Sequence, residues 1–212
     1  MSGTRVHLVR HGEVHNPEGI LYGRLDGYRL SERGQRMAQR LAGHFTTPPA
    51  DVVHLVASPM QRAQETIAPL AAALDLPVRT DDRVIEADSV FEGLDLAPNP
   101  RQLAHPRFWR YLLNPFRPSW GEPFREQVAR MIEAIRDARV AAEGHDAVIV
   151  SHQSPIWMTR MALEGRSFVR DPRRRECTLA SVTTLTFDGG TLVGLDYTEP
   201  AADLLVGAVA IT

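Results

Sequence analysis

The sequence contains one cysteine, Cys177, so an internal disulfide framework is excluded and a reducing, cytoplasmic environment is expected. No apolar run approaches the roughly 20 residues of a membrane-spanning helix. The amino terminus also lacks an apolar leader segment. The sequence also lacks a large net charge, because 24 basic residues nearly balance 26 acidic ones. We therefore expect neither nucleic acid nor a membrane as partner, and we interpret Cys177 as a structural thiol.

A length of 212 residues suits one domain with a substantial apolar core, and we expect a single domain over residues 1–212. The segment at about 95–125 is rich in proline and aromatic residues and too apolar for a flexible linker. We expect a packed excursion there, with a short helix near 101–113, that forms a lid or pocket wall. Ordinary aromatic core packing is the alternative. The basic run Arg170–Arg175 is interpreted as a solvated loop, with anion binding as its alternative.

Strand-like and helix-like periods alternate along the rest of the chain. Short apolar runs predict buried strands at residues 6–9, 52–57 and 147–150. Apolar positions at helical spacing predict helices after Ser31, after Ser58 and around 128–135, and Ser154-Pro155 opens one more. Two further strands, joined by Asp188-Gly189-Gly190, predict a hairpin near the carboxyl end. This alternation is typical of an α/β fold with a mostly parallel sheet.

Polar side chains follow three of the predicted strands. Arg10-His11-Gly12-Glu13 follows the first, Ser58 to Arg62 the second, and Ser151-His152-Gln153 the third. Open α/β sheets bind ligands at the carboxyl ends of their strands, so two arginines and two histidines are expected at one edge. Ser58 and Gln61 form a capping-box pair, with Pro59 in the first helical position. This helix start would place Arg62 beside free backbone N–H groups that favour an anion.

This set of side chains favours phosphoryl transfer. The sequence has no serine elbow, Walker loop or clustered cysteines, whereas arginine matches phosphate oxygens and an imidazole can attack phosphorus. The attacking imidazole must be neutral, with a partner on its other nitrogen. A metal site built from His11, His15, His54 and His152 is the weaker alternative, since two arginines would repel a divalent cation. We expect no metal ion and no cofactor.

The ordered motifs resemble the signature of the histidine phosphatase superfamily, branch 1, the group that contains phosphoglycerate mutases and many phosphatases. The motifs are Leu8-Val9-Arg10-His11-Gly12-Glu13, Gly23-Arg24-Leu25-Asp26, Leu30-Ser31-Glu32-Arg33-Gly34, Ala57-Ser58-Pro59 with Arg62-Ala63 and Thr66, and Val150-Ser151-His152. The resemblance implies a phosphoglycerate mutase-like, three-layer α/β/α sandwich. It also implies that His11 accepts the phosphoryl group, that Arg10, Arg62 and His152 hold it, and that no metal is needed.

The resemblance further implies a carboxylic acid that protonates the leaving oxygen. The family carries this acid after the strand that follows the second helix, and here Val84-Ile85-Glu86 precedes Phe91-Glu92-Gly93. Glu86 is therefore the candidate, with Asp88 and Glu92 as reserves, and a raised pKa of Glu86 would suit the role. The alternative is a solvated loop carboxylate.

Departures from the family pattern concern the pocket. Gln153 stands where the family commonly has glycine, and Asn16 comes one residue earlier than the family's asparagine. The segment from His15 to Tyr22 lacks the mutases' usual tryptophan. Candidate phosphate or substrate contacts are Arg10, Asn16, Tyr22, Gly23, Arg24, Arg62, His152 and Gln153. These departures favour a phosphatase with its own pocket over a glycolytic mutase, and Tyr22 with the aromatic segment hints at a ring-bearing or bulky substrate.

The sequence therefore predicts a metal-independent phosphomonoesterase that acts through phosphohistidine at His11, with water as the second acceptor. A phosphomutase that needs a phosphorylated primer is one alternative. A catalytically silent module that binds a phosphorylated ligand is the other, because one fold can host different functions. The expected partner is a small phosphate ester, and the candidate assembly is a homodimer.

Overall fold

A six-stranded sheet forms the centre of the computed structural model, which describes residues 3–48, 51–94, 106, 121–168 and 176–208. The strands are β1 (Thr4–Arg10), β2 (Val52–Ala57), β3 (Val78–Thr80), β4 (Asp146–Ser151), β5 (Val182–Asp188) and β6 (Thr191–Thr198). They lie in the order β3-β2-β4-β1-β5-β6, with the first four parallel and the β5–β6 hairpin antiparallel. The predicted strands and hairpin are confirmed.

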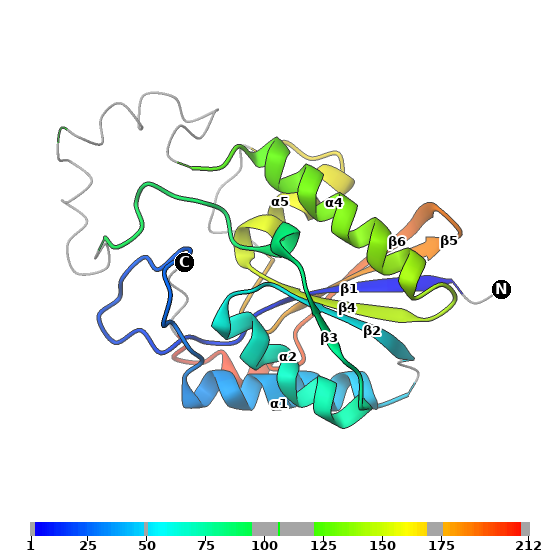
Figure 1. The fold of residues 1–212 in the computed structure, drawn as a ribbon, viewed down its shortest axis with the longest axis horizontal. Helices are drawn as coiled ribbons and strands as arrows, with labels where there is room; N and C mark the ends of the chain where they lie inside the picture. Colours follow the sequence, from blue (N-terminus) through cyan, green and yellow to red (C-terminus); the bar gives the residue numbers. More distant parts are fainter. Residues whose placement is uncertain (1–2, 49–50, 95–105, 107–120, 169–175, 209–212) are drawn as a thin grey trace.

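Helices cover both faces of this sheet. The helices α1 (Glu32–Thr46) and α2 (Gln61–Leu74) pack on one face, and α4 (Phe124–Ala141) and α5 (Gln153–Leu163) pack on the other (Figure 1). Short 3-10 turns, η1 (Asp82–Val84) and η4 (Ala202–Leu204), complete the described elements. The expected three-layer sandwich is confirmed, as is Ser31 as the cap of α1, since its side chain accepts a hydrogen bond from the N–H of Gly34.

Alternation along the strands divides the apolar core into two halves. In β4, Ala147 and Ile149 pack against α4 and α5, whereas Val148 and Val150 pack against α1 and α2. This alternation follows from the period of two in a strand, which sends successive side chains to opposite faces. All six residues of β4 are buried, so the central strand is fixed in register and its carboxyl end is held rigidly.

The start of α2 differs from the sequence prediction. The helix begins at Gln61 with Met60 as its N-cap, so Ser58 does not form a capping box with Gln61 and Pro59 is not the first helical residue. The backbone N–H of Ser58 instead donates to the carbonyl of Val150 at 3.0 Å, which keeps Ser58 at the sheet edge. The Ser58 side chain can therefore form hydrogen bonds with residues at the carboxyl end of β4.

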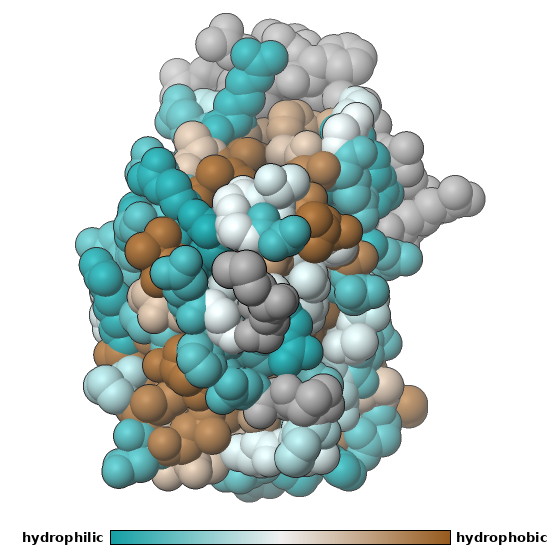
Figure 2. Space-filling model, turned by 90° about the vertical axis from the view of Figure 1, so that its right-hand side faces the viewer, coloured by the Kyte–Doolittle hydropathy of each residue, from teal (hydrophilic) through white to brown (hydrophobic). Residues whose placement is uncertain are grey.

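Some sequence predictions fall outside the described residues. These are most of the 95–125 excursion, including the helix near 101–113, and the basic run from Arg170 to Arg175. On the side that carries the amino end of β1, hydrophobic and hydrophilic residues are intermixed (Figure 2). None of the described helices has the length and apolarity needed to cross a bilayer. The homodimer stays a prediction.

Asp146 anchors the amino end of β4. Its carboxylate accepts hydrogen bonds from Arg5 Nε at 2.7 Å and Nη2 at 2.6 Å, and from the Asp51 N–H at 3.1 Å. Burial alone would raise the pKa of Asp146, but hydrogen bonds from His7 and Arg5 and from the backbone of Asp51 outweigh it and lower the pKa to about 2. The carboxylate of Asp146 therefore stabilises the folded state at every pH at which it is ionised.

Replacing Asp146 with Asn is expected to lower the free energy of unfolding at pH 7 by about 2 kcal/mol. Because the folded-state pKa is depressed, the wild-type advantage is present above the unfolded pKa of about 4 and disappears as pH falls to about 2. Urea titrations of both proteins at several pH values measure this difference in the free energy of unfolding. The control is Asp188→Asn, on an exposed residue at the end of β5. An Asp146→Asn deficit that is equally large at the lowest pH would contradict this account.

Candidate active site

The carboxyl ends of β1, β2 and β4 bring the predicted catalytic residues together. β1 ends at Arg10 and β4 at Ser151, and the N–H of His11 donates to the Ser151 carbonyl at 3.1 Å. The rings of His11 and His152 lie 5.2 Å apart between centroids. Arg62 enters from the first turn of α2, directly after β2. The structure therefore unites four residues from three separate segments of the sequence.

His11 is held as a neutral imidazole with one free nitrogen. Its Nδ1 lies 2.8 Å from the carbonyl oxygen of Gly12, which can only accept, so Nδ1 carries the proton. Burial, with the charges of Arg62 and Arg10, holds the pKa of His11 well below its usual value. Its Nε2 is buried and has no hydrogen-bond partner among the described residues. The lone pair on Nε2 is thus available for attack, as the sequence analysis required.

Close backbone packing sets the position of His11. A Cβ added at Gly12 would lie 2.8 Å from the carbonyl oxygen of Gly34, so only glycine allows α1 to approach this closely. The N–H of Gly12 donates to Thr66 Oγ1 at 3.1 Å, and that hydroxyl donates to the Arg62 carbonyl at 2.7 Å. The loop that carries His11 is therefore tied to the helix that carries Arg62.

The two arginines are buried with donors to spare. Arg10 is 1% exposed and Arg62 is 0% exposed. Each uses one terminal nitrogen on a carbonyl: Arg10 Nη1 donates to Cys177 at 2.8 Å and Arg62 Nη2 to Gly23 at 2.7 Å. Arg10 Nε and Nη2 and Arg62 Nε have no partner among the described residues. These free N–H groups suit the oxygens of an anion.

The second histidine is oriented by Ser58. His152 Nε2 lies 2.7 Å from Ser58 Oγ, whereas the buried Nδ1 has no described partner. Burial and the nearby Arg62, His11 and Arg10 lower the pKa of His152 well below its usual value. Ser58 is the site residue that the sequence analysis missed, because its place before a helix was interpreted as a cap. Its position within the motif Ala57-Ser58-Pro59 was the available clue.

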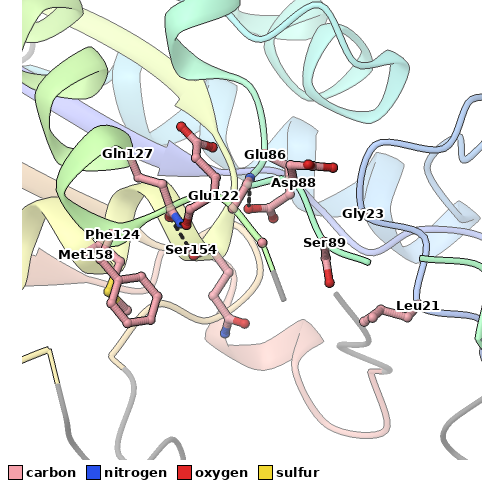
Figure 3. Close-up of a pocket in the computed structure, with 13 residues that line it drawn as sticks. Leu21, Gly23, Glu86, Asp88, Ser89, Glu122, Phe124, Gln127, Ser154 and Met158 are labelled. Carbon is pink, nitrogen blue, oxygen red and sulfur yellow. Dashed lines mark hydrogen bonds between the residues drawn. The ribbon is translucent and has the colours of Figure 1, made fainter. Parts of the chain in front are cut away.

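Glu86 is buried and lines an open pocket of about 210 Å³ (Figure 3). It is 4% exposed, which argues against a solvated loop carboxylate. Its Oε1 accepts the N–H of Ala87 at 2.8 Å, and its Oε2 has no described partner. Burial raises the pKa of Glu86 although Arg62, Arg10 and Arg130 oppose it. When the carboxyl is protonated, Oε2 is the atom that can donate to an oxygen in the pocket.

The reserve acids occupy different places. Asp88 is exposed and lines the pocket with Glu86. The Glu92 carboxylate instead accepts the N–H of Arg24 at 2.8 Å, against Gly23. Gly23 has a positive φ of 37°, and an added Cβ would lie 2.1 Å from Glu92 Oε1, so a side chain at Gly23 would displace this arrangement.

The remaining predicted phosphate or substrate contacts have different partners in the structure. Tyr22 lies under the guanidinium of Arg62, 4.8 Å from carbon to ring centroid, and its pKa is raised to about 12 by burial. Gln153 lines the pocket. The Asn16 amide pairs with the backbone of Ile20. The Arg24 guanidinium donates to the backbone carbonyl of Glu86 and to the carboxylate of Glu122. Phosphate contacts by Asn16 and Arg24 stay predictions.

Cys177, His15 and His54 lie in surroundings that differ from those of His11 and His152. Burial raises the pKa of the Cys177 thiol to about 11, so the thiolate is scarce near neutral pH. His15 is exposed and His54 lies half-buried in β2. Within the described ranges, no group of three or more His, Cys, Asp or Glu side chains is placed to hold a metal ion.

Comparison with known proteins identifies the family of this chain. The model of the histidine phosphatase superfamily (branch 1) matches residues 6–199. The uncharacterized protein Rv0525 of Mycobacterium tuberculosis is 52% identical over 199 residues, covering 94% of this chain and 98% of that protein. Phosphoserine phosphatase 1 of Hydrogenobacter thermophilus is 32% identical over 166 residues, covering 76% and 77%. The solved structure of YhfR from Bacillus stearothermophilus is 26% identical with a TM-score of 0.70, covering 90% and 94%. The chain belongs to the histidine phosphatase superfamily, branch 1.

Proposed function

We propose that this protein is a metal-independent phosphomonoesterase that acts through a phosphohistidine at His11. The observation that carries the proposal is the burial of Arg10 and Arg62 without an ion-paired carboxylate among the described residues. Burying two unpaired cations is costly unless a bound anion compensates for them. A phosphate dianion would accept hydrogen bonds from their free N–H groups and place its phosphorus before His11 Nε2.

The first step transfers the phosphoryl group to the protein. The lone pair of His11 Nε2 attacks phosphorus, and the bond from phosphorus to the leaving oxygen breaks. Glu86 Oε2 gives its proton to that oxygen, so a neutral alcohol leaves. Arg10, Arg62 and His152 stabilise the charge on the phosphoryl oxygens, which is the main catalytic demand of phosphoryl transfer.

The second step releases inorganic phosphate. A water molecule attacks the phosphorus of phosphohistidine as the nitrogen–phosphorus bond breaks. The carboxylate of Glu86, now ionised, accepts a proton from that water, and His11 returns to its neutral form. Phosphate release restores both groups for another turnover.

Hydrolysis of a panel of phosphate esters in the presence of a chelator tests the proposal. The panel contains aryl phosphates, sugar phosphates, phosphoserine and 3-phosphoglycerate. Release of inorganic phosphate that survives chelation supports the proposal. Turnover of 3-phosphoglycerate only after addition of a bisphosphorylated primer, with no net phosphate release, would overturn it in favour of a phosphomutase.

Replacing Glu86 with Gln is expected to lower kcat/KM for phenyl phosphate about 10²- to 10³-fold, because the basic phenoxide must be protonated as it leaves. The loss of kcat/KM with 4-nitrophenyl phosphate is expected to stay within about fivefold, since 4-nitrophenoxide leaves with less help and kcat/KM does not include the second step, which both substrates share. The wild-type rate with phenyl phosphate should fall as pH rises through the raised pKa of Glu86, and the variant should lack this alkaline decline.

The matched control for this prediction is Asp88→Asn, which changes a second carboxylate of the same pocket. Steady-state rates with both substrates across the pH range are the measurement. A selective loss in Asp88→Asn with none in Glu86→Gln would move the acid to Asp88. Equal losses with both substrates in Glu86→Gln would remove the general-acid role.

A further inference from the structure

The backbone around Glu86 is held by two arginines from distant parts of the chain. Arg24, in the loop before α1, donates from Nε to the Glu86 carbonyl at 2.7 Å. Arg130, on α4, donates from Nη1 to the carbonyls of Ile85 and Arg83, each at 2.7 Å. This stretch begins in η1, where the Ile85 N–H donates to the Asp82 carbonyl at 3.2 Å and the Val84 carbonyl accepts a hydrogen bond from Ser151 Oγ at 2.7 Å. The two arginines add hydrogen bonds to the carbonyls on either side of Val84 and to that of Glu86.

Glu122 joins the two arginines. Its Oε2 accepts from Arg24 Nη2 at 3.1 Å and from Arg130 Nη2 at 2.9 Å, while Oε1 accepts from Arg130 Nε at 2.7 Å. The carboxylate side chain is 13% exposed and that of Arg130 is 16% exposed, so solvent screens this pair only in part. We call these three residues the Arg24–Glu122–Arg130 bridge.

The backbone of Glu122 is fixed to the same stretch. Its N–H donates to the Asp88 carbonyl at 3.1 Å, and Gly121 pairs with Ser89. A Cβ on Gly121 would lie 2.2 Å from the Asp88 carbonyl oxygen, so this contact requires glycine. Glu122 and Glu86 both line the pocket (Figure 3). The bridge therefore connects the candidate acid to a second chain segment that lines the same pocket.

Each arginine of the bridge uses its planar fork on the carboxylate and on backbone carbonyls, one for Arg24 and two for Arg130. Lysine, a single ammonium on a flexible stem, cannot reproduce this pattern. Glu86 needs such support, because its Oε1 is occupied by Ala87 and only Oε2 remains for the leaving oxygen. Proton transfer requires that oxygen within about 3 Å, and a displacement of about 1 Å can cost 10²-fold in rate.

We propose that the Arg24–Glu122–Arg130 bridge positions Glu86 for proton donation, so that its contribution to turnover grows with the basicity of the leaving group. This inference rests on the proposed function, in which Glu86 is the general acid. The bridge residues are positioning residues, because they act through the backbone of Glu86. A bridge that only stabilised the fold would affect all substrates alike.

Two variants test the inference, Glu122→Gln and Arg130→Met, each measured with phenyl phosphate and 4-nitrophenyl phosphate. Both are expected to lose about 10-fold or more in kcat/KM, which reports the first step, with phenyl phosphate and less than about threefold with 4-nitrophenyl phosphate. Retained hydrolysis of 4-nitrophenyl phosphate shows that the variants are folded. The matched control is Arg139→Met on the same helix, whose guanidinium donates to the Gly189 carbonyl away from the pocket.

The same variants in a Glu86→Gln background complete the test. If the bridge acts through Glu86, Glu122→Gln costs less than about twofold there, because coupled residues are non-additive. Equal losses with both substrates, or an undiminished loss in the Glu86→Gln background, would overturn the inference. A Glu86→Gln variant without leaving-group selectivity would instead overturn the general-acid assignment itself, so the two failures are distinguishable.

Discussion

His11→Ala is expected to reduce turnover about 10⁴-fold or more, because the variant lacks the nitrogen proposed to accept the phosphoryl group. In wild type, Nδ1–H donates to the Gly12 carbonyl and leaves Nε2 free to attack. The lowered pKa of His11 keeps it neutral near pH 7. Alanine leaves Arg10, Arg62 and His152 in place, so phosphate binding should persist. The measurement is steady-state hydrolysis of 4-nitrophenyl phosphate in chelator, with phosphate binding by calorimetry.

The matched control for this variant is His15→Ala. His15 is four residues further along the same loop and is exposed. We expect its replacement to leave turnover within about twofold of wild type, as for most exposed residues. Turnover that survives in His11→Ala would contradict the assignment of the nucleophile, and an inactive His15→Ala would move attention to the other histidines.

Arg62→Met is expected to lower kcat/KM about 10³- to 10⁵-fold, the range for losing an arginine that stabilises a phosphoryl group. Two effects combine. The variant loses the Arg62 Nε donor, which has no partner among the described residues. It also loses the positive charge that, next to burial, contributes most to lowering the pKa of His11. With that pKa raised, His11 becomes protonated at higher pH. The acid side of the pH–rate profile should therefore move to higher pH in the variant.

Stability should respond to Arg62→Met in the opposite direction from activity. The guanidinium of Arg62 is fully buried with one carbonyl partner and no ion pair among the described residues. Replacement of such a cation by an apolar chain of similar length removes a desolvation cost, so the thermal midpoint should be unchanged or higher without phosphate. The control is Arg36→Met, on the exposed side of α1. A destabilised, unfolded Arg62→Met or an unmoved acid limb would contradict this account.

Much of the fold is predictable because local pattern and tertiary arrangement agree. The runs at 52–57 and 147–150 are apolar, and parallel strands in this order bring their ends together, so Arg10, His11 and His152 were correctly placed at one edge. Ser58 was misassigned because a serine before a helix has two competing uses, as a cap and as a partner for a neighbouring strand. Its hydrogen bond to His152 spans 94 residues, beyond any local pattern.

The Arg24–Glu122–Arg130 bridge escaped the sequence analysis for the same reason. Arg24 and Glu122 are 98 residues apart, and neither stands in a periodic pattern that marks a contact. Arg24 was predicted as a substrate contact from its motif, whereas the structure gives it partners in the wall of the pocket. Charged residues in irregular segments find partners through the fold as a whole, which a single sequence does not encode locally.

Trapping of the covalent intermediate tests the central claim most directly. Wild-type protein is mixed with an aryl phosphate in chelator, quenched in alkali within the first turnovers, digested and analysed by mass spectrometry. We predict one added phosphoryl group on the peptide that carries His11, stable in alkali and lost in acid, and absent from His11→Ala. Hydrolysis of the same substrate without any phosphoryl group on His11, or with the label on another residue, would contradict the account.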